Sequence, residues 1–139
     1  MTSYDVIYQR FLNKITSFKI LELSDNDVQE MMLMWLTSAI SKFRKCKSDL
    51  SKRDDEILEF EEELLDAEIE ILALLMVNEW LEPQINSELY VNQFYGGKEE
   101  RFYAQANQLD KLMDLKQSNH LRAQKLMRDY AYQTLARIS

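Results

Sequence analysis

Residues 66–83 read "DAEIEILALLMVNEWLEP", and in this segment apolar side chains cover almost the whole circumference of a helix. Ile69, Leu72, Met76 and Leu81 fall near one face at helical spacing, and other apolar residues fill much of the remainder. Its longest apolar run, "ILALLMV", is far shorter than the roughly 20 residues that span a bilayer. The segment therefore predicts a helix that is surrounded by other elements of a protein core.

The rest of the chain indicates helices as well. Two glycines and one proline in 139 residues are too few for the frequent turns of a sheet protein. We therefore predict a mainly all-α fold, a bundle of four to five helices in a single domain spanning residues 1–139. The expected helices cover residues 3–18, 25–46, 66–84, 98–117 and 119–137, and the last two are either separate or continuous.

Local signals support individual helix boundaries. Thr2 or Ser3 is expected to cap the first helix. Ser24 opens the second helix with Asp27 three residues later, an acidic variant of the capping box. Asp66 is expected to cap the central helix. The apolar faces of the first two helices consist of Ile7, Phe11, Ile15 and Phe18, and of Val28, Met32, Trp35, Ala39 and Phe43.

Two stretches interrupt the helical pattern. Residues 47–65, here called the acidic segment, are rich in charge and are expected to form a surface loop, as an irregular excursion, a short strand or a helical turn. The predicted fold also leaves room for a short hairpin. Pro83 should end or kink the central helix, because proline has no backbone N–H to donate. Residues 89–95 alternate as a short strand would, and Gly96 and Gly97 mark a turn.

Charge and composition argue against several classes of function. A formal net charge of -7 argues against binding to nucleic-acid phosphates or to anionic lipid. Cys46, the only cysteine, cannot form an intramolecular disulfide and is consistent with a reducing compartment. Two lysines flank it, but we expect an ordinary residue and not a nucleophile.

Catalytic and metal-binding patterns are lacking in the sequence. His120 is the only histidine, so Glu-x-x-His pairs on facing helices cannot accompany Glu79 and Glu82 in a di-metal site. There is also no glycine-rich phosphate loop. We therefore expect no enzyme activity, no catalytic residue, no cofactor and no metal.

The sequence resembles a group of small helical proteins encoded among the head-assembly genes of tailed bacteriophages. The resemblance is carried by "DAEIEILALLMVNEWLEPQINS" (66–87) and "QFYGGKEERFYAQANQLDKLMDLKQSNHLRAQKLMRDYAY" (93–132), and it extends to "SYDVIYQRFLNKI" and "MMLMWLTSAISKFRKC". These proteins are head-to-tail connector, or adaptor, proteins. The resemblance implies a virion protein, made in the bacterial host cytoplasm, that forms a ring of about twelve copies beneath the portal protein.

In such a ring the expected partners are the portal protein, further connector or tail-completion proteins and neighbouring copies. Double-stranded DNA would pass through the lumen without specific binding, and no membrane is involved. Terminal segments and long loops commonly make the contacts in this group, so the resemblance implies contacts by the C-terminal stretch from residue 122 and by residues 49–63. The predicted partner-binding residues are Arg122, Lys125, Arg128, Tyr130, Tyr132 and Arg137, and the predicted neighbour contacts are Tyr90, Phe94 and Tyr95.

Other interpretations stay open at this point. The basic residues of the last helix also fit an ordinary solvated face. A monomeric acidic helical module that binds another protein, such as a phage-encoded inhibitor that mimics DNA, is the alternative function. Under the connector interpretation, deletion of residues 128–139 is expected to weaken portal binding while the bundle stays folded.

Overall fold

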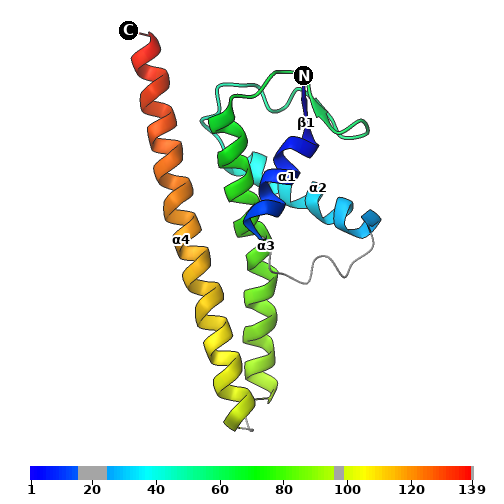
Figure 1. The fold of residues 1–139 in the computed structure, drawn as a ribbon, viewed down its shortest axis with the longest axis vertical. Coiled ribbons are helices and arrows are strands. Elements are labelled where there is room, and N and C mark those ends of the chain that lie inside the picture. The colour runs from blue at the N-terminus through cyan, green and yellow to red at the C-terminus, as the bar shows by residue number, and fades with distance from the viewer. Residues whose placement is uncertain (16–24, 96–98, 139) are drawn as a thin grey trace.

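The computed structural model describes the backbone of residues 1–15, 25–95 and 99–138. It is 73% helical, so the predicted all-α bundle is confirmed, with a small sheet added (Figure 1). The elements in chain order are β1 (Thr2–Ser3), α1 (Tyr4–Lys14), α2 (Asp25–Lys42), β2 (Arg53–Asp54), β3 (Glu59–Phe60), α3 (Asp66–Tyr95) and α4 (Glu99–Ile138).

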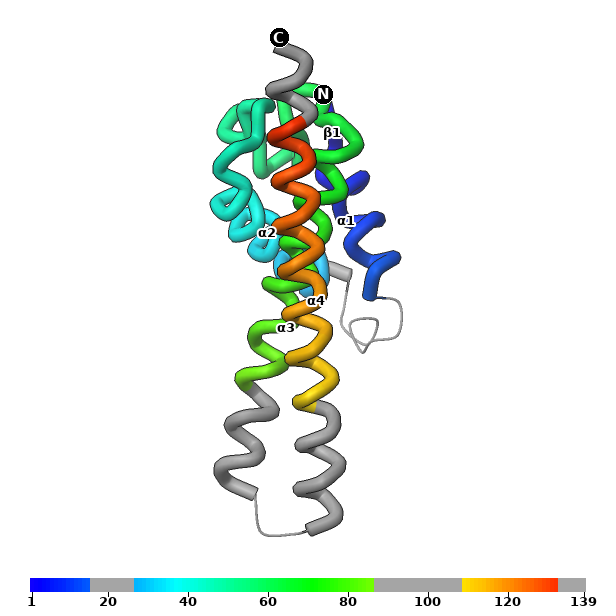
Figure 2. The backbone as a smooth tube through the Cα atoms, turned by 90° about the vertical axis from the view of Figure 1, so that its left-hand side faces the viewer, coloured from blue at the N-terminus to red at the C-terminus, as the bar shows by residue number. Residues whose placement is uncertain are grey.

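Helix α3 forms the centre of the fold. Helices α1 and α2 pack against it on one side, and α4 runs antiparallel along another (Figures 1 and 2). Every residue from Ile71 to Asn78 is buried, which confirms the prediction of a surrounded central helix. Each fully buried leucine or isoleucine here stabilises the fold by about 1.5–3 kcal/mol. Among the described residues, no helix has the length and apolar character needed to cross a membrane.

The first two helices bury the faces that the sequence predicts. Ser3 caps α1, because its hydroxyl accepts the backbone N–H of Asp5 at 3.2 Å. The aromatic rings of Phe11 on α1 and Trp35 on α2 lie 5.6 Å apart, centre to centre, and join the two helices over α3. Phe18 and Ser24 lie outside the described residues. The other predicted core residues of these helices are buried or half-buried: Ile7, Phe11, Ile15, Val28, Met32, Trp35, Ala39 and Phe43.

The start of α3 differs from the prediction in one detail. Leu65 takes the capping position, since its carbonyl accepts the backbone N–H of Ile69 at 3.0 Å. Asp66, the predicted cap, instead pairs with Arg10 of α1 at 2.6 Å. Arg10 also contacts Glu70 at 3.4 Å, so one cation ties α1 to the first turns of α3.

The acidic segment contains a hairpin, β2–β3, whose second strand also pairs with β1 in the order β1-β3-β2, antiparallel throughout. Phe60 of β3 is fully buried, with its ring centre 4.8 Å from that of Tyr4. Thr2 fixes the end of the segment, because its hydroxyl donates to the carbonyl of Glu62 and accepts the N–H of Leu64. The predicted acidic loop is thus anchored to the N-terminus of the chain.

Helix α3 continues through Pro83 to Tyr95, so the predicted helix end near residue 84 and the predicted strand after it are wrong. Pro83 lies on the exposed side of α3, where water can replace the hydrogen bond that proline removes. Ile85, two residues later, is buried. Apolar packing on the inner side therefore continues to favour the helix beyond the proline.

Helix α4 is a single helix, so of the two alternatives left open for the last two predicted helices, the continuous one is confirmed. Its inner side follows a regular three- and four-residue spacing that passes through Asn119 without interruption. Packing against α3 therefore keeps α4 continuous, although Ser118 and Asn119 resemble the N-cap of a new helix. The described residues of this buried or half-buried stripe are Leu109, Leu112, Lys116, Asn119, Ala123, Leu126 and Tyr130.

Candidate protein-binding surface on the C-terminal helix

A buried carboxylate fastens α4 to the rest of the molecule. Glu68, near the start of α3, is 0% exposed. Its Oε1 accepts the N–H of Leu65 and the hydroxyl proton of Ser48, both at 2.8 Å. Its Oε2 accepts from the hydroxyl of Tyr130 at 2.8 Å and from the thiol of Cys46 at 3.1 Å. One side chain thus joins α3, α4 and the turn that follows α2.

Tyr130 belongs to this network and not to the outer surface. Its side chain is 3% exposed, and its hydroxyl also accepts the backbone N–H of Lys47 at 2.8 Å. Its ring contacts that of Phe43, with the ring centres 5.4 Å apart. The prediction that Tyr130 binds a partner is therefore wrong: the residue lies on the inner stripe of α4, where it anchors the helix to the core.

The network sets the pKa values of its acidic groups. Burial alone would raise the pKa of Glu68, but hydrogen bonds from Leu65, Cys46, Tyr130 and Ser48 together hold it below its ordinary value. Burial, together with the hydrogen bond to Glu68 and its charge, raises the pKa of the Cys46 thiol to about 12. The thiol is therefore protonated near neutral pH and is a poor nucleophile.

The lowered pKa of Glu68 predicts a pH-dependent stability. Because its folded pKa lies below the ordinary value of 4.5, the carboxylate stabilises the fold fully above that pH, and the contribution disappears as the pH falls through the folded pKa. We expect the difference in unfolding free energy between the wild type and Glu68→Gln to be largest at neutral pH and to shrink under acid. Urea unfolding at several pH values measures it. A difference that grows under acid would mean that Glu68 is neutral in the folded protein.

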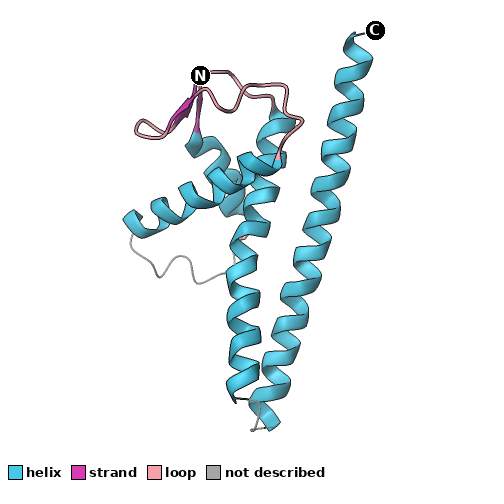
Figure 3. Cartoon of the chain, turned by 180° about the vertical axis from the view of Figure 1, so that it is seen from behind, coloured by secondary structure: helices cyan, strands magenta, loops and turns pink. Residues whose placement is uncertain are grey.

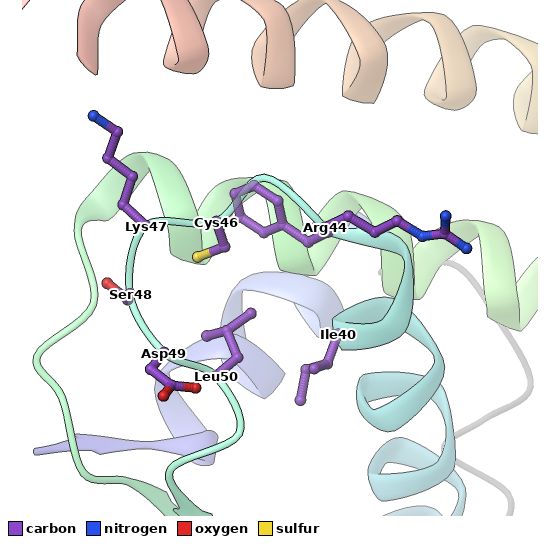
Figure 4. Close-up of a pocket in the computed structure, with 8 residues that line it drawn as sticks. Ile40, Arg44, Cys46, Lys47, Ser48, Asp49 and Leu50 are labelled. Carbon is purple, nitrogen blue, oxygen red and sulfur yellow. The ribbon is translucent and has the colours of Figure 1, made fainter. Parts of the chain in front are cut away.

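A pocket of about 340 Å³ lies beside this network (Figure 4). The pocket offers few groups for catalysis, because the Cys46 thiol is hydrogen-bonded to Glu68 and no histidine lines the pocket. In Figure 4 the side chains of Arg44 and Lys47 extend away from the centre of the pocket. The lining residues are Ile40, Phe43, Arg44, Cys46, Lys47, Ser48, Asp49 and Leu50.

A second pocket, of about 540 Å³, lies where Ile85 of α3 faces α4, with the exposed His120 at its border. Asp110 and Asp114 also border it, and Met113, 49% exposed, adds an apolar side chain. In the part of the chain that the structure describes, no group of three His, Cys, Asp or Glu side chains is placed to hold a metal ion.

The most distinctive surface is the side of α4 turned away from α3. We call Leu121, Arg122, Lys125, Arg128 and Tyr132 the outer face of α4. Leu121 is 56% exposed and Tyr132 is 72% exposed. The three cations are exposed as well, and none of the ion pairs found among the described residues includes a residue of α4. This face therefore combines unpaired positive charge with exposed apolar side chains, a composition suited to binding a protein.

The structure assigns the remaining predicted residues as follows. Four predicted partner-binding residues, Arg122, Lys125, Arg128 and Tyr132, lie together on the outer face. Arg137 is in α4, and Tyr90, Phe94 and Tyr95 are in α3, but their side chains lie outside the described residues. The network around Glu68 was not predicted from the sequence. A glutamate in the first turn of a helix was its one local signal.

Comparison with family models, with curated proteins and with solved structures finds no match to this chain.

Proposed function

We propose that this protein is a structural component of the head-to-tail connector of a tailed bacteriophage. Copies form a ring under the portal, extend the DNA channel and join the capsid to the tail. The observation that carries the proposal is the outer face of α4, which offers exposed apolar side chains and cations that form no ion pair among the described residues. The resemblance of residues 66–132 to connector proteins supports the same function.

The charge of the chain suits a channel through which DNA moves. A formal net charge of -7 repels phosphates, so an acidic wall leaves the DNA free to slide. Three of the exposed cations, Arg122, Lys125 and Arg128, lie on the outer face of α4, and in this proposal contacts with protein cover them. DNA then passes through the lumen without specific binding.

The anchoring role of Tyr130 changes how portal binding should be tested. Deletion of residues 128–139 removes Tyr130 and leaves the buried Glu68 and the N–H of Lys47 without their partner, so the expectation that the bundle stays folded is withdrawn. Paired substitution of exposed residues avoids this problem.

We expect Arg128→Ala/Tyr132→Ala to keep the helical content and melting temperature of the wild type and to weaken binding to the portal by about tenfold or more. Both side chains are exposed, and Arg128 forms no ion pair among the described residues. Biolayer interferometry on immobilised portal measures the affinity. The matched control is Gln117→Ala/Gln124→Ala, on exposed positions of the same helix. Equal portal affinity of both variants would refute the role of the outer face.

Electron microscopy of the purified protein, alone and mixed with the portal from the same genome, tests the function itself. A ring of this protein on the portal supports the connector proposal and identifies the surface that lines the channel. A monomer that does not bind the portal refutes it and favours the acidic protein-binding module.

A further inference from the structure

The cations on the outer face of α4, which form no ion pair among the described residues, are complementary to a negatively charged surface, and the chain carries one elsewhere. Residues 54–63 contain seven carboxylates and no basic residue. They include the turn and second strand of the β2–β3 hairpin, with Ile57, 60% exposed, in the turn. Each surface thus places an exposed apolar side chain among charges, and the two sets of charges have opposite sign.

The geometry of the hairpin directs its acids outward. Phe60 is fully buried, and successive residues of a strand point to opposite sides, so Glu59 and Glu61 face away from the core. Glu56 lies in the turn and is exposed. Among the carboxylates of residues 54–63, only Asp55 has a cation within ion-pair distance in the described structure, namely Arg53 at 3.5 Å. Asp54 and Glu62 accept backbone N–H groups nearby, whereas the side chains of Glu56 and Glu61 form no hydrogen bond or ion pair among the described residues and are available to a partner.

The tip of the hairpin is held in one conformation. Leu58 has a φ of 58°, in the left-handed region that is costly for a bulky residue. Its carbonyl accepts the N–H of Tyr4 at 2.9 Å, and the hydroxyl of Tyr4 donates to Asp55 at 2.7 Å. These bonds fix the turn with Leu58 half-buried and Ile57 exposed. A tip that is already ordered loses little conformational entropy on binding.

The two surfaces cannot meet within one chain. The hairpin and α4 lie on opposite sides of α3, as the front and back views show (Figures 1 and 3). Two complementary patches on opposite sides of a molecule join successive copies head to tail, and such contacts close into a ring when the rotation permits.

We propose that the β2–β3 hairpin of one copy docks on the outer face of α4 of the next copy. Ile57 packs against Leu121, while Glu56 and Glu61 pair with Arg122 and Lys125. Arg128 and Tyr132, further along α4, are left to the portal. The inference deepens the proposed function and rests on it for closure of the ring, because it names the two surfaces that connect neighbours. The contact between copies itself does not require the portal.

Charge reversal tests the contact on the full chain. One variant, Glu56→Lys/Glu61→Lys, makes the hairpin positive, and the other, Arg122→Glu/Lys125→Glu, makes the α4 surface negative. Each variant alone places like charges opposite one another, so we expect the association constant to fall about a hundredfold. In an equal mixture, each positive hairpin meets a negative α4 and each negative hairpin meets a positive α4, so association should return. Sedimentation velocity at low salt measures all three samples.

The matched control is Glu30→Lys/Glu82→Lys, which changes the net charge as the hairpin variant does but at exposed positions outside both surfaces. It should associate at least as well as the wild type. Circular dichroism checks that each variant is folded. Restored association in the mixture supports the contact. A wild-type protein that stays monomeric, or a mixture that fails to associate while the wild type does, overturns it.

The same samples distinguish this inference from the proposed function. If the mixture associates but no sample binds the portal, the contact between copies stands and the connector function fails. If both single variants still form rings on the portal, the connector function stands and the hairpin contact is overturned.

Discussion

Glu68→Ala is expected to lower the free energy of unfolding by about 3–5 kcal/mol, because it leaves several buried donors without an acceptor. The N–H of Leu65 and the hydroxyls of Ser48 and Tyr130 all donate to this carboxylate at 2.8 Å. The variant also leaves a cavity at a fully buried position. Urea unfolding followed by circular dichroism measures the change.

The matched control for Glu68 is Glu63→Ala, at an exposed position shortly before α3. We expect it to change the unfolding free energy by less than about 0.5 kcal/mol. A similar small change for Glu68→Ala would show that the network contributes little and that apolar packing alone holds α4 in place.

Leu72→Ala is expected to cost about 2–5 kcal/mol, since it removes buried methyl groups at the centre of α3 and opens a cavity there. Leu72 is 0% exposed and lies in the helix that α1, α2 and α4 all cover. Thermal and urea unfolding should both show the loss, with the unfolding transition still cooperative.

Leu121→Ala provides the comparison for Leu72, because it makes the same chemical change on the outer face of α4. At protein concentrations where the chain is monomeric, it should cost less than about 0.5 kcal/mol. An equal loss for both leucines would mean that the outer face packs against the molecule, which would contradict its use as a binding surface.

The apolar pattern was sufficient to predict the helices and the central position of α3. Burial of Ile7 and Phe11 in α1, and of Met32 and Trp35 in α2, follows from three- and four-residue spacing alone. The pattern failed at Pro83 and could not decide between a break and a continuous helix near Asn119, because packing on the inner side overrides the local stop and start signals. Such packing depends on neighbours that local sequence does not reveal.

The network around Glu68 shows the same limit more clearly. Glu68 and Glu70 both lie in the first turns of α3. Glu68 is fully buried, whereas Glu70 is half-buried and pairs with Arg10. The partners that distinguish them are distant in sequence: Ser48 is 20 residues away and Tyr130 is 62. Helical spacing places Tyr130 and Tyr132 on opposite sides of α4, but it does not reveal that the inward tyrosine meets Glu68.

The order of the helices along the chain also matters during synthesis. Helices α1 and α2 leave the ribosome before α3 and can cover it at once, whereas α4, which covers another side, emerges last. Until then the nascent chain exposes part of its most apolar helix, and Glu68 lacks its bond to Tyr130. A chain arrested before α4 should therefore aggregate.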